Sequence, residues 1–364
     1  MNDPLFHTPC HDWHAAHGGR MVDFAGWHMP VQYSSITEEH HAVRNAAGMF
    51  DIAHMGRLAF TGPDAARFLD RLLTNRVADL QFGQIRYALV CNESGGVLDD
   101  VLVYRLDGFH LLVVNASNRL KVLDWIDEHR GGFDMQIEDW TFGRFMLALQ
   151  GPKALEILEP LTAHDLRDTP YYWGVEDEVI GTPAVVSRTG YTGEDGFEVI
   201  LPAEHGPRLW DTLLERGEVL GLRPCGLGCR DTLRLEAAMP LYGHELDEET
   251  DPLTAGLTFA VKLDKEVFIG REALRAVKEK GPRQRRIGLE LEGRRIAREG
   301  AGVFTGAEEI GCVTSGTFSP TLEKSIAMAY AAKEHAAPGT TLEVDIRGKR
   351  IAAVVVKLPF YRRL

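Results

Sequence analysis

Apolar side chains follow a strand period in some segments of the chain and a helical period in others. Residues 56–63 are mostly apolar and end in a Gly-Pro pair, and residues 64–73 then place apolar side chains at helical spacing. Residues 145–152 and 153–161 repeat this order. Because proline is favoured in the first turn of a helix, each Gly-Pro pair predicts the end of a strand and the start of a helix. We therefore expect two related strand–helix units, although the match is too short to define a repeat protein.

Further strand and helix patterns surround these two units. Strand patterns occupy residues 86–91, 97–105, 110–115, 183–188 and 196–201, and helical patterns occupy residues 118–129, 206–216 and 227–237. The strands and helices do not alternate regularly, which disfavours a parallel βαβ sheet. The pattern therefore predicts an α+β fold with mostly antiparallel sheets and flanking helices.

The last part of the chain has a different composition. Residues 278–286 are charged and contain a Gly-Pro pair, which predicts a linker. The sequence beyond it is strand-like over residues 287–291, 311–317, 325–330, 341–346 and 351–358. Turn residues between these strands predict a small C-terminal β-barrel or jelly-roll-like domain. A chain of 364 residues exceeds what one hydrophobic core usually supports, so two or three domains are expected.

The charge balance narrows the class of partner. The net charge of −13 disfavours nucleic acid and anionic membranes as partners. No segment approaches the roughly 20 apolar residues of a transmembrane helix. The first four residues lack the basic and apolar regions of a signal peptide. We therefore expect a cytoplasmic protein.

Cysteine and histidine give weaker indications. The five cysteines are odd in number and scattered, which favours reduced thiols over a disulfide framework. Cys225 and Cys229 have a CxxxC spacing that leaves open a redox or structural role beside simple burial. Of the 14 histidines, those at positions 7, 11, 14 and 17 are spaced so that some share a helix face, and His40, His41 and His54 add further rings. No matching cysteine or carboxylate cluster completes a site, so these rings are expected to be solvated and no catalytic metal is predicted.

The segment 92–104 contains the first candidate for chemistry. Its Ser-Gly-Gly sequence predicts a turn that leads into a strand with two adjacent carboxylates, Asp99 and Asp100. Neighbouring side chains in a strand point to opposite faces, so the two carboxylates cannot do the same work. Apolar residues flank both faces, and at least one aspartate is expected to be partly buried with a shifted pKa. The alternative is an aspartate that only caps the turn.

Two further segments are rich in glycine and charge. Residues 188–198 contain three glycines among aromatic and acidic residues, which allows close approach to a flat ligand or forms an ordinary hairpin turn. Residues 224–236 place Arg230 near the start of a helix, where it suits an anionic or carbonyl-bearing ligand. A salt-bridged helix face of Arg230, Asp231, Arg234 and Glu236 is the alternative. Neither segment fits a phosphate loop or a dinucleotide fingerprint.

With these segments in view, the whole chain resembles the glycine cleavage T-protein family. The resemblance is carried by residues 20–27, 38–44, 47–55, 95–100, 189–198, 226–236, 268–272 and 314–330. It implies a three-domain cloverleaf with tetrahydrofolate in a central channel. The implied domains are a discontinuous folate-binding domain of residues 1–51 and 140–270, an inserted domain of residues 52–139, and a C-terminal barrel of residues 271–364.

The resemblance also implies a reaction and its participants. A lipoylated H-protein delivers an aminomethyl group, and the enzyme passes the carbon to tetrahydrofolate, which releases ammonia and forms 5,10-methylenetetrahydrofolate. Glycine decarboxylase and dihydrolipoyl dehydrogenase are the functional neighbours in such a system. No metal, flavin or nucleotide is expected to take part.

Site residues follow from positions that match the family. Asp99 matches the essential aspartate, which would orient the folate amine or accept its proton. Glu198 matches the residue that accepts hydrogen bonds from the donor edge of the pterin. The remaining matches are Tyr191 and Arg230, which contact the pterin, Met55, Tyr87 and Asn115, which line the same cavity, and Arg362, which lies in a tail that reaches back to it.

Other readings of the same fold stay open. A relative could demethylate a small methylated substrate and again pass the carbon to tetrahydrofolate. A non-catalytic folate-binding protein of iron–sulfur assembly is a different class, but its Lys-Gly-Cys-Tyr motif does not occur in this chain. Flavin-linked sarcosine and dimethylglycine oxidases share this module but need an additional dinucleotide domain, for which the chain has no room.

Overall fold

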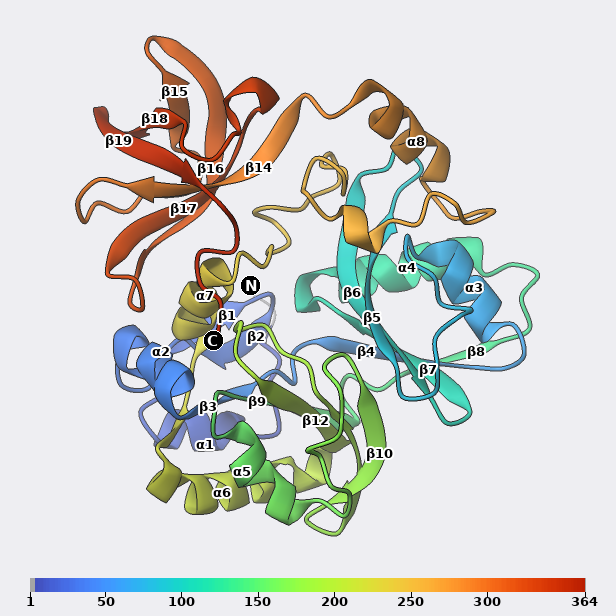
Figure 1. Cartoon of the computed structure of the whole chain (residues 1–364). Coiled ribbons are helices and arrows are strands. Elements are labelled where there is room, and N and C mark those ends of the chain that lie inside the picture. Colours follow the sequence, from blue (N-terminus) through green and yellow to red (C-terminus); the bar gives the residue numbers. More distant parts are fainter. Residues whose placement is uncertain (1–3, 364) are drawn as a thin grey trace. The chain divides into compact units, whose positions relative to one another are not determined.

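A computed structural model describes residues 4–363 of the chain (Figure 1). The chain divides into two compact units. The first unit comprises Met1–Leu69, Val77–Tyr87 and Val101–Asp231, and the second comprises Asp70–Arg76, Ala88–Asp100 and Thr232–Leu364. Within the described residues, no helix has both the length and the apolar composition that crossing a bilayer requires. The sequence prediction about a signal peptide concerns residues 1–3 in part, and these lie outside the described residues.

A six-stranded sheet forms the core of the first unit (Figure 1). Its strands, in spatial order, are β10 (Gly174–Val179), β11 (Thr182–Ser187), β12 (Gly196–Pro202), β9 (Arg144–Gln150), β3 (Ala47–Asp51) and β13 (Leu222–Pro224). Neighbouring strands are antiparallel except β13, which runs parallel to β3. Trp210 and Leu213 of helix α6 (Gly206–Gly217) are fully buried with Leu147 and Phe197 of the sheet. Burial of these large apolar side chains stabilises this layer by about 1.5–3 kcal/mol each.

A second antiparallel sheet contains the other predicted Gly-Pro unit. Its order is β5 (Ile85–Cys91), β6 (Val97–Leu106), β7 (Phe109–Val114), β4 (Gly56–Thr61) and β8 (Gln136–Asp139). Strands β5 and β6 each contribute residues to both units. Helices α3 (Ala65–Leu72) and α4 (Arg119–His129) follow β4 and β7 along the chain, as the pattern predicted. The corresponding order in the first sheet is β9 followed by α5 (Ala154–Leu158).

The N-terminal segment was not resolved into elements by the sequence patterns. It forms α1 (His11–Ala16), the hairpin β1 (Met21–Phe24) and β2 (Trp27–Pro30), and α2 (Ile36–Asn45). His14 is fully buried and lies 2.8 Å from an Asp51 carboxylate oxygen and 2.8 Å from the Tyr33 hydroxyl. His40 and His54 are also buried, so the prediction of solvated histidines is wrong for these three residues. Through hydrogen bonds at both ring nitrogens, His14 therefore joins α1 to Asp51 of β3 and to Tyr33.

A closed six-stranded barrel completes the second unit, which confirms the predicted C-terminal barrel (Figure 1). Its strands, in spatial order, are β14 (Gln284–Leu291), β17 (Lys324–Ala332), β16 (Glu308–Ser319), β15 (Gly302–Thr305), β18 (Thr341–Ile346) and β19 (Lys349–Val356). Alternate positions Ala327, Ala329 and Ala331 of β17 face the barrel core. Small side chains at these positions suit the narrow interior of a six-stranded barrel.

The predicted linker at residues 278–286 is wrong in extent. Helix α8 (Arg271–Lys280) continues through the charged residues, and β14 begins at Gln284. Arginine, lysine and glutamate are good helix formers, and only Leu274 of this helix is buried. Gly281 then has a positive φ of 72°, which ends the helix.

The remaining helical segments are short. Helix α7 (Leu227–Glu236) lies where the helical pattern over residues 227–237 placed it. The 3₁₀ turns are Ala116–Asn118, Glu159–Leu161, Ala203–His205, Glu218–Leu220, Thr258–Ala260 and Lys333–His335.

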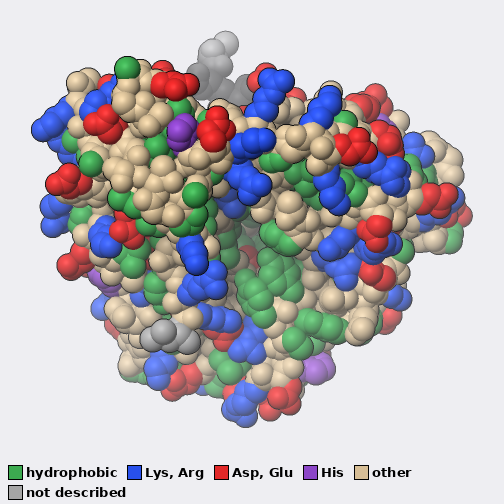
Figure 2. All heavy atoms as spheres, turned by 45° about the horizontal axis from the view of Figure 1, so that its top comes forward, with side chains coloured by type: hydrophobic (Ala, Val, Ile, Leu, Met, Phe, Trp, Pro, Cys, Tyr) green, Lys and Arg blue, Asp and Glu red, His purple; other side chains and the backbone are tan. Residues whose placement is uncertain are grey.

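On the face drawn in Figure 2, basic and acidic side chains are intermixed, so the net negative charge does not gather there into one patch.

Candidate functional site

Glu198 is the best-defined polar group among the predicted site residues. It lies on β12 opposite Ser187 of β11, and it is 6% exposed. The Thr189 hydroxyl donates a hydrogen bond of 2.5 Å to a Glu198 carboxylate oxygen. Burial raises the pKa of Glu198, although the Thr189 hydrogen bond and the Arg230 charge oppose that rise. The carboxylate is therefore held in place while its ionised form is made less favourable than in water.

Hydroxyl groups extend this contact into the sheet. The Ser187 and Thr189 hydroxyl oxygens are 2.9 Å apart, and the Tyr104 hydroxyl lies 3.4 Å from the Ser187 hydroxyl. Tyr104 and Ser187 are both buried. Local sequence patterns gave no signal for a role of Tyr104 and Ser187, because no motif joins strand β6 to strand β11. They act on the candidate site by orienting Glu198.

Arg230 and Tyr191 form a second part of the site in the same unit. The Arg230 guanidinium carbon lies 4.9 Å from the centre of the Tyr191 ring, which is a cation–π contact. Burial lowers the pKa of Arg230, and the nearby Glu198 carboxylate opposes this effect. The Nη1 atom of Arg230 is buried and has no hydrogen-bond partner within residues 4–363. A buried donor without a partner is costly unless a ligand satisfies it.

The loop between β11 and β12 is more than an ordinary hairpin turn. Its backbone passes so close to Gln150 that a Cβ atom on Gly190 would lie 1.9 Å from the Gln150 amide oxygen. The Gln150 amide nitrogen donates to the Thr189 carbonyl at 3.0 Å, and Arg44 forms a buried ion pair of 2.9 Å with Glu194. These long-range contacts fix the loop that carries Tyr191.

His54 adds a residue that sequence analysis had placed among the surface imidazoles. It is 2% exposed, and its Nδ1 atom is buried without a hydrogen-bond partner among the residues that the structure describes. Burial and the Arg230 charge lower the pKa of His54 to about 3. The ring is therefore neutral at physiological pH, and its neighbour along the chain is the predicted cavity residue Met55.

The other predicted residues of the first unit take half-buried positions. Met55 follows β3, Tyr87 lies on β5, and Asn115 directly follows β7. The Asn115 carbonyl accepts a hydrogen bond of 3.0 Å from the Asn118 amide. Their participation in one cavity with Glu198 and Arg230 stays a prediction.

In the second unit, the turn before the two aspartates is tightly defined. The Asn92 side-chain oxygen accepts from the Gly96 amide at 2.9 Å, and the Val97 amide donates to the Asp247 carbonyl at 2.9 Å. Asp99 is fully buried, and Asp100 is half-buried. This difference agrees with the expectation that adjacent strand residues face opposite ways. A burial difference alone does not assign a catalytic role to either carboxylate.

The proposed salt-bridged face of α7 is wrong for two of its members. Arg234 and Glu236 are 2% and 0% exposed rather than on the surface. Arg234 forms an ion pair of 2.8 Å with Glu245, and the Ser319 hydroxyl lies 2.5 Å from Glu236. The first contact joins the helix to the segment that follows it, and the second joins the helix to strand β16 within the second unit.

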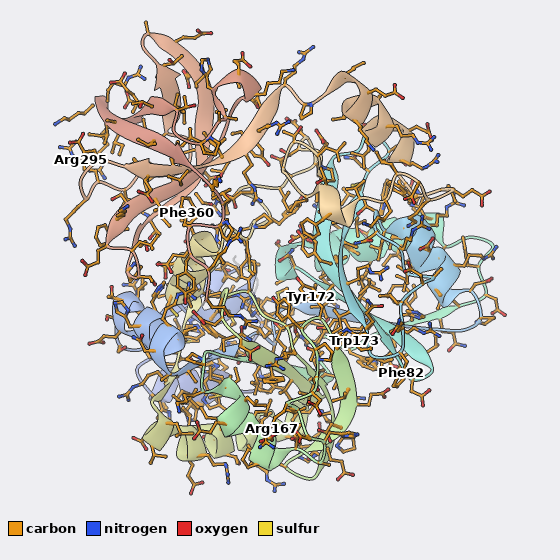
Figure 3. All side chains as sticks on the ribbon, in the orientation of Figure 1. Phe82, Arg167, Tyr172, Trp173, Arg295 and Phe360 are labelled. Carbon is orange, nitrogen blue, oxygen red and sulfur yellow. The ribbon has the colours of Figure 1, made fainter. Side chains whose placement is uncertain are left out.

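The C-terminal tail packs on this same part of the second unit. The Tyr361 amide donates to the Glu236 carbonyl at 2.9 Å, and Phe360 packs with Leu235 and Met328 (Figure 3). Arg362 is exposed. Whether Arg362 contacts a bound folate stays a prediction.

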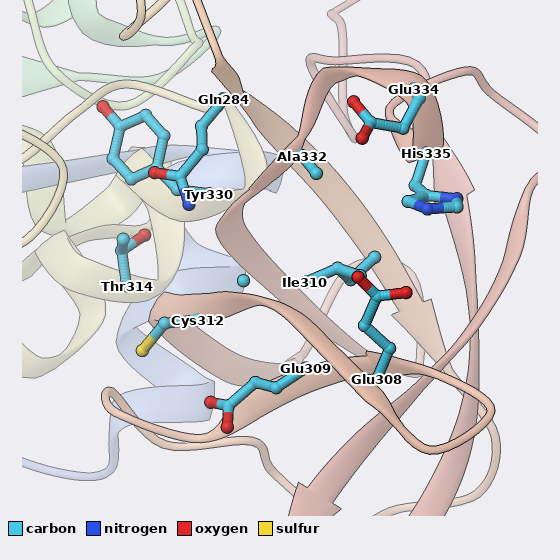
Figure 4. Close-up of a pocket in the computed structure, with 11 residues that line it drawn as sticks. Gln284, Glu308, Glu309, Ile310, Cys312, Thr314, Tyr330, Ala332, Glu334 and His335 are labelled. Carbon is cyan, nitrogen blue, oxygen red and sulfur yellow. The ribbon is translucent and has the colours of Figure 1, made fainter.

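A pocket of about 500 Å³ opens on the barrel and has different chemistry (Figure 4). Its lining includes Glu308, Glu309 and Glu334 together with His335 and Cys312. None of the predicted site residues within the described part of the chain lines it. Like charges repel, so an acidic pocket of this composition does not suit a ligand with a negatively charged tail, such as a folate.

In the part of the chain that the structure describes, two clusters of side chains bring potential metal ligands within 4.8 Å of one another. One contains Glu39, Cys225 and Cys229, all buried. The Glu39 carboxylate accepts hydrogen bonds from the amides of Tyr33 at 2.5 Å and Gly226 at 2.8 Å, so it is committed to the backbone. This cluster therefore stabilises the local packing, and neither cysteine forms a disulfide bond. The other cluster contains three histidines of the N-terminal segment.

Comparison with known proteins gives one consistent result. The family model for the GCVT N-terminal domain matches residues 10–265, and the model for the glycine cleavage T-protein C-terminal barrel domain matches residues 284–362. Aminomethyltransferases of Symbiobacterium thermophilum and Rubrobacter xylanophilus are 50% and 52% identical to this chain. The first match covers 100% of this chain and 99% of the relative, and the second covers 99% and 95%.

A solved structure shows the same fold. The glycine cleavage system aminomethyltransferase T of Bartonella henselae matches with a TM-score of 0.92 at 36% identity, over 98% of both chains. Full-length matches at this identity extend through both compact units and through every segment that carries the predicted site residues. The chain therefore belongs to the glycine cleavage T-protein family, the aminomethyltransferases.

Proposed function

We propose that this chain transfers the carbon of an aminomethyl group from a lipoylated H-protein to tetrahydrofolate. Aminomethyltransferases are folate-dependent enzymes, and the chain is a full-length member of that family. In the proposed reaction the carbon–sulfur and carbon–nitrogen bonds of the carrier break, and two bonds from the carbon to the folate nitrogens N5 and N10 form. Of the two protons that leave these nitrogens, one goes to the lipoyl sulfur and the other leaves with ammonia.

The observation that carries the proposal is the pairing of two buried groups in the first unit. Glu198 offers a carboxylate held by Thr189, and Arg230 offers a buried N–H group that has no hydrogen-bond partner among the described residues. A pterin ring presents N–H donors and a carbonyl acceptor along one edge, which these two groups complement. The Tyr191 ring against Arg230 adds a flat surface for an aromatic ligand.

Asp99 is the residue to which we assign the proton chemistry. The folate amine becomes a better nucleophile when a carboxylate orients it and accepts its proton. Full burial of Asp99 on β6 holds the carboxylate away from competing water. Met55, Tyr87, Asn115 and Arg362 are assigned supporting contacts with the folate.

The proposal includes partners and location. The carbon donor is the lipoylated H-protein, and glycine decarboxylase and dihydrolipoyl dehydrogenase are functionally linked through it in the cytoplasm. The transfer itself is proposed to need no metal, flavin or nucleotide, and to involve neither nucleic acid nor membrane. Three structural domains with the boundaries given above remain part of the proposal.

A reconstituted assay tests this function. Purified protein is mixed with aminomethylated H-protein and tetrahydrofolate, and ammonia and 5,10-methylenetetrahydrofolate are measured as they form. Equal yields of both products are expected, with no product from a carrier that lacks the lipoyl group. Transfer of a methyl group from a sulfonium or methoxy compound to tetrahydrofolate, with no turnover of the aminomethylated carrier, would show a demethylase instead. Folate binding without either activity would indicate the non-catalytic class, and loss of activity in chelator would contradict the metal-free step.

A further inference from the structure

Three histidines come together in the N-terminal segment of the first unit. His7 precedes α1, His11 is the first residue of α1, and His28 lies on β2. One ring nitrogen from each lies within 4.8 Å of the others. None of the three belongs to the proposed folate site or to its hydrogen-bonded neighbours. His28 lies 17 residues after His11 and 21 residues after His7, so only the tertiary fold brings it to the other two.

Backbone hydrogen bonds build this cluster. The Phe6 amide donates to the Gly26 carbonyl at 2.8 Å, and the His28 amide donates to the Phe6 carbonyl at 2.9 Å. These two bonds place His7 beside His28. The Phe6 and Trp27 rings pack at a centroid distance of 5.3 Å and reinforce the same contact. The side chains therefore start from a fixed framework, which reduces the entropy cost of arranging ligands around an ion.

The ring nitrogens of His11 are oriented in a way that suits a metal ligand. Its Nδ1 atom lies 3.0 Å from an Asp12 carboxylate oxygen. A carboxylate only accepts, so Nδ1 carries the proton and donates it to Asp12. The lone pair is then on Nε2, which lies 2.9 Å from Nδ1 of His28. Metal-binding histidines commonly donate their other ring N–H to a carboxylate, which fixes this tautomer.

The third ring completes the set. His7 stacks on His11 with a centroid distance of 3.6 Å and an interplanar angle of 5°. His7 is exposed, so its ring is free to turn from the stacked position and direct a nitrogen toward an ion. Neutral imidazole is the form that binds divalent transition metals.

We propose that His7, His11 and His28 bind one divalent transition metal ion, with Zn²⁺ as the probe of choice. Three imidazoles and one water give the four-coordinate geometry that Zn²⁺ prefers. On binding, the hydrogen bond between His11 Nε2 and His28 Nδ1 is replaced by a coordinate bond from each of these two atoms to the ion. The proton on Nδ1 of His28 moves to Nε2 of the same ring. The ion cross-links the segment before α1, the start of α1 and strand β2. Its role is to stabilise the N-terminal segment and not to take part in the transfer reaction.

Direct metal binding tests the proposal with the full chain, produced without an affinity tag and freed of metal by chelator. Zn²⁺ is titrated in competition with a chromophoric chelator, and one equivalent per chain is expected to bind. Co²⁺ in its place is expected to give the intense visible absorption of a four-coordinate site. Because only the folded cluster binds the ion, Zn²⁺ should also raise the midpoint of thermal unfolding.

Matched variants locate the ion. His7→Ala, His11→Ala and His28→Ala are each expected to weaken Zn²⁺ binding about tenfold or more, since each removes a ligand. His17→Ala is the control, because His17 is exposed in the same segment but stacks on Trp13 outside the cluster. Equal affinity in all four variants and the unchanged chain would overturn the proposal. So would a stoichiometry far below one, or a loss of affinity as large in His17→Ala as in the others.

Discussion

Replacing Glu198 with glutamine separates the cost of this residue to folding from its proposed role in folate binding. Glu198→Gln keeps the shape of the side chain and its ability to accept the Thr189 hydrogen bond, but removes the negative charge. It also puts a donor NH₂ group against the N–H edge of the ligand. Loss of a hydrogen bond to a charged group, with a ligand donor left unpaired, costs about 1–3 kcal/mol. The dissociation constant of tetrahydrofolate should therefore rise roughly 5- to 150-fold.

The same change should stabilise the protein without ligand. Burial raises the pKa of Glu198, so the ionised form is less stable in the folded protein than in the unfolded chain. The contribution of protonated Glu198 to the free energy of unfolding is therefore fully present below the ordinary glutamate pKa of about 4.3. This contribution is lost as the pH rises through the raised pKa of the folded protein. Glu198→Gln removes this loss. Its thermal midpoint should exceed that of the unchanged protein at pH 7, and the two should converge near pH 4.

Calorimetry of folate binding and thermal unfolding at several pH values measure both effects. Asp177→Asn provides the control, because Asp177 is a buried carboxylate of β10 that accepts hydrogen bonds from the backbone and from the His164 ring. The control should lose stability and keep its folate affinity. An unchanged folate affinity in Glu198→Gln would remove this residue from the site. A lower thermal midpoint at pH 7 would refute the reasoning about its ionisation.

Two further substitutions test the framework around the site. A Cβ atom on Gly96 would lie 1.8 Å from the Glu248 carbonyl oxygen, so Gly96→Ala should destabilise the protein by about 1–3 kcal/mol in chemical denaturation. Gly131→Ala meets no atom within 4 Å and is the control, so equal losses in both would contradict this account. Burial opposes ionisation of Asp51, but the hydrogen bond from His14 lowers its pKa overall. The stabilisation by ionised Asp51 is lost as the pH falls through the lowered pKa. Asp51→Asn should therefore cost more stability at pH 7 than at pH 3. A loss of stability of the same size at both pH values would argue against this reasoning.

Local patterns in the sequence predicted the elements that depend on local physics. The two Gly-Pro units, five of the six barrel strands and the different burial of Asp99 and Asp100 follow from helical and strand periods, whereas β15 was not predicted. The error at residues 278–286 arose because charged residues also form exposed helices, and α8 continues to Lys280. The pattern singled out Asp99, Asp100 and Arg230 as candidates, and the family resemblance then selected Asp99 and added the other candidate site residues.

Contacts between distant segments could not be predicted. The hydrogen bond from Thr189 to Glu198 depends on how β11 and β12 meet, and the surroundings of the Arg230 N–H, which has no partner within residues 4–363, depend on the position of α7. The histidine cluster likewise depends on the pairing of Phe6 with Gly26 and His28. Histidine spacing alone pointed to a shared helix face, whereas His28 is contributed by a strand. Such features become visible only once the tertiary fold is known.

Turnover of two adjacent variants tests the central claim most directly, which is that Asp99 is the carboxylate that acts on the folate amine. Asp99→Asn keeps the shape and removes the ability to take a proton, so kcat should fall on the order of 100-fold or more. KM should change little, since the lost interaction strengthens in the transition state. Asp100→Asn should turn over aminomethylated carrier and tetrahydrofolate at nearly the unchanged rate and lose only stability. Normal turnover by Asp99→Asn, with an inactive but folded Asp100→Asn, would contradict the account.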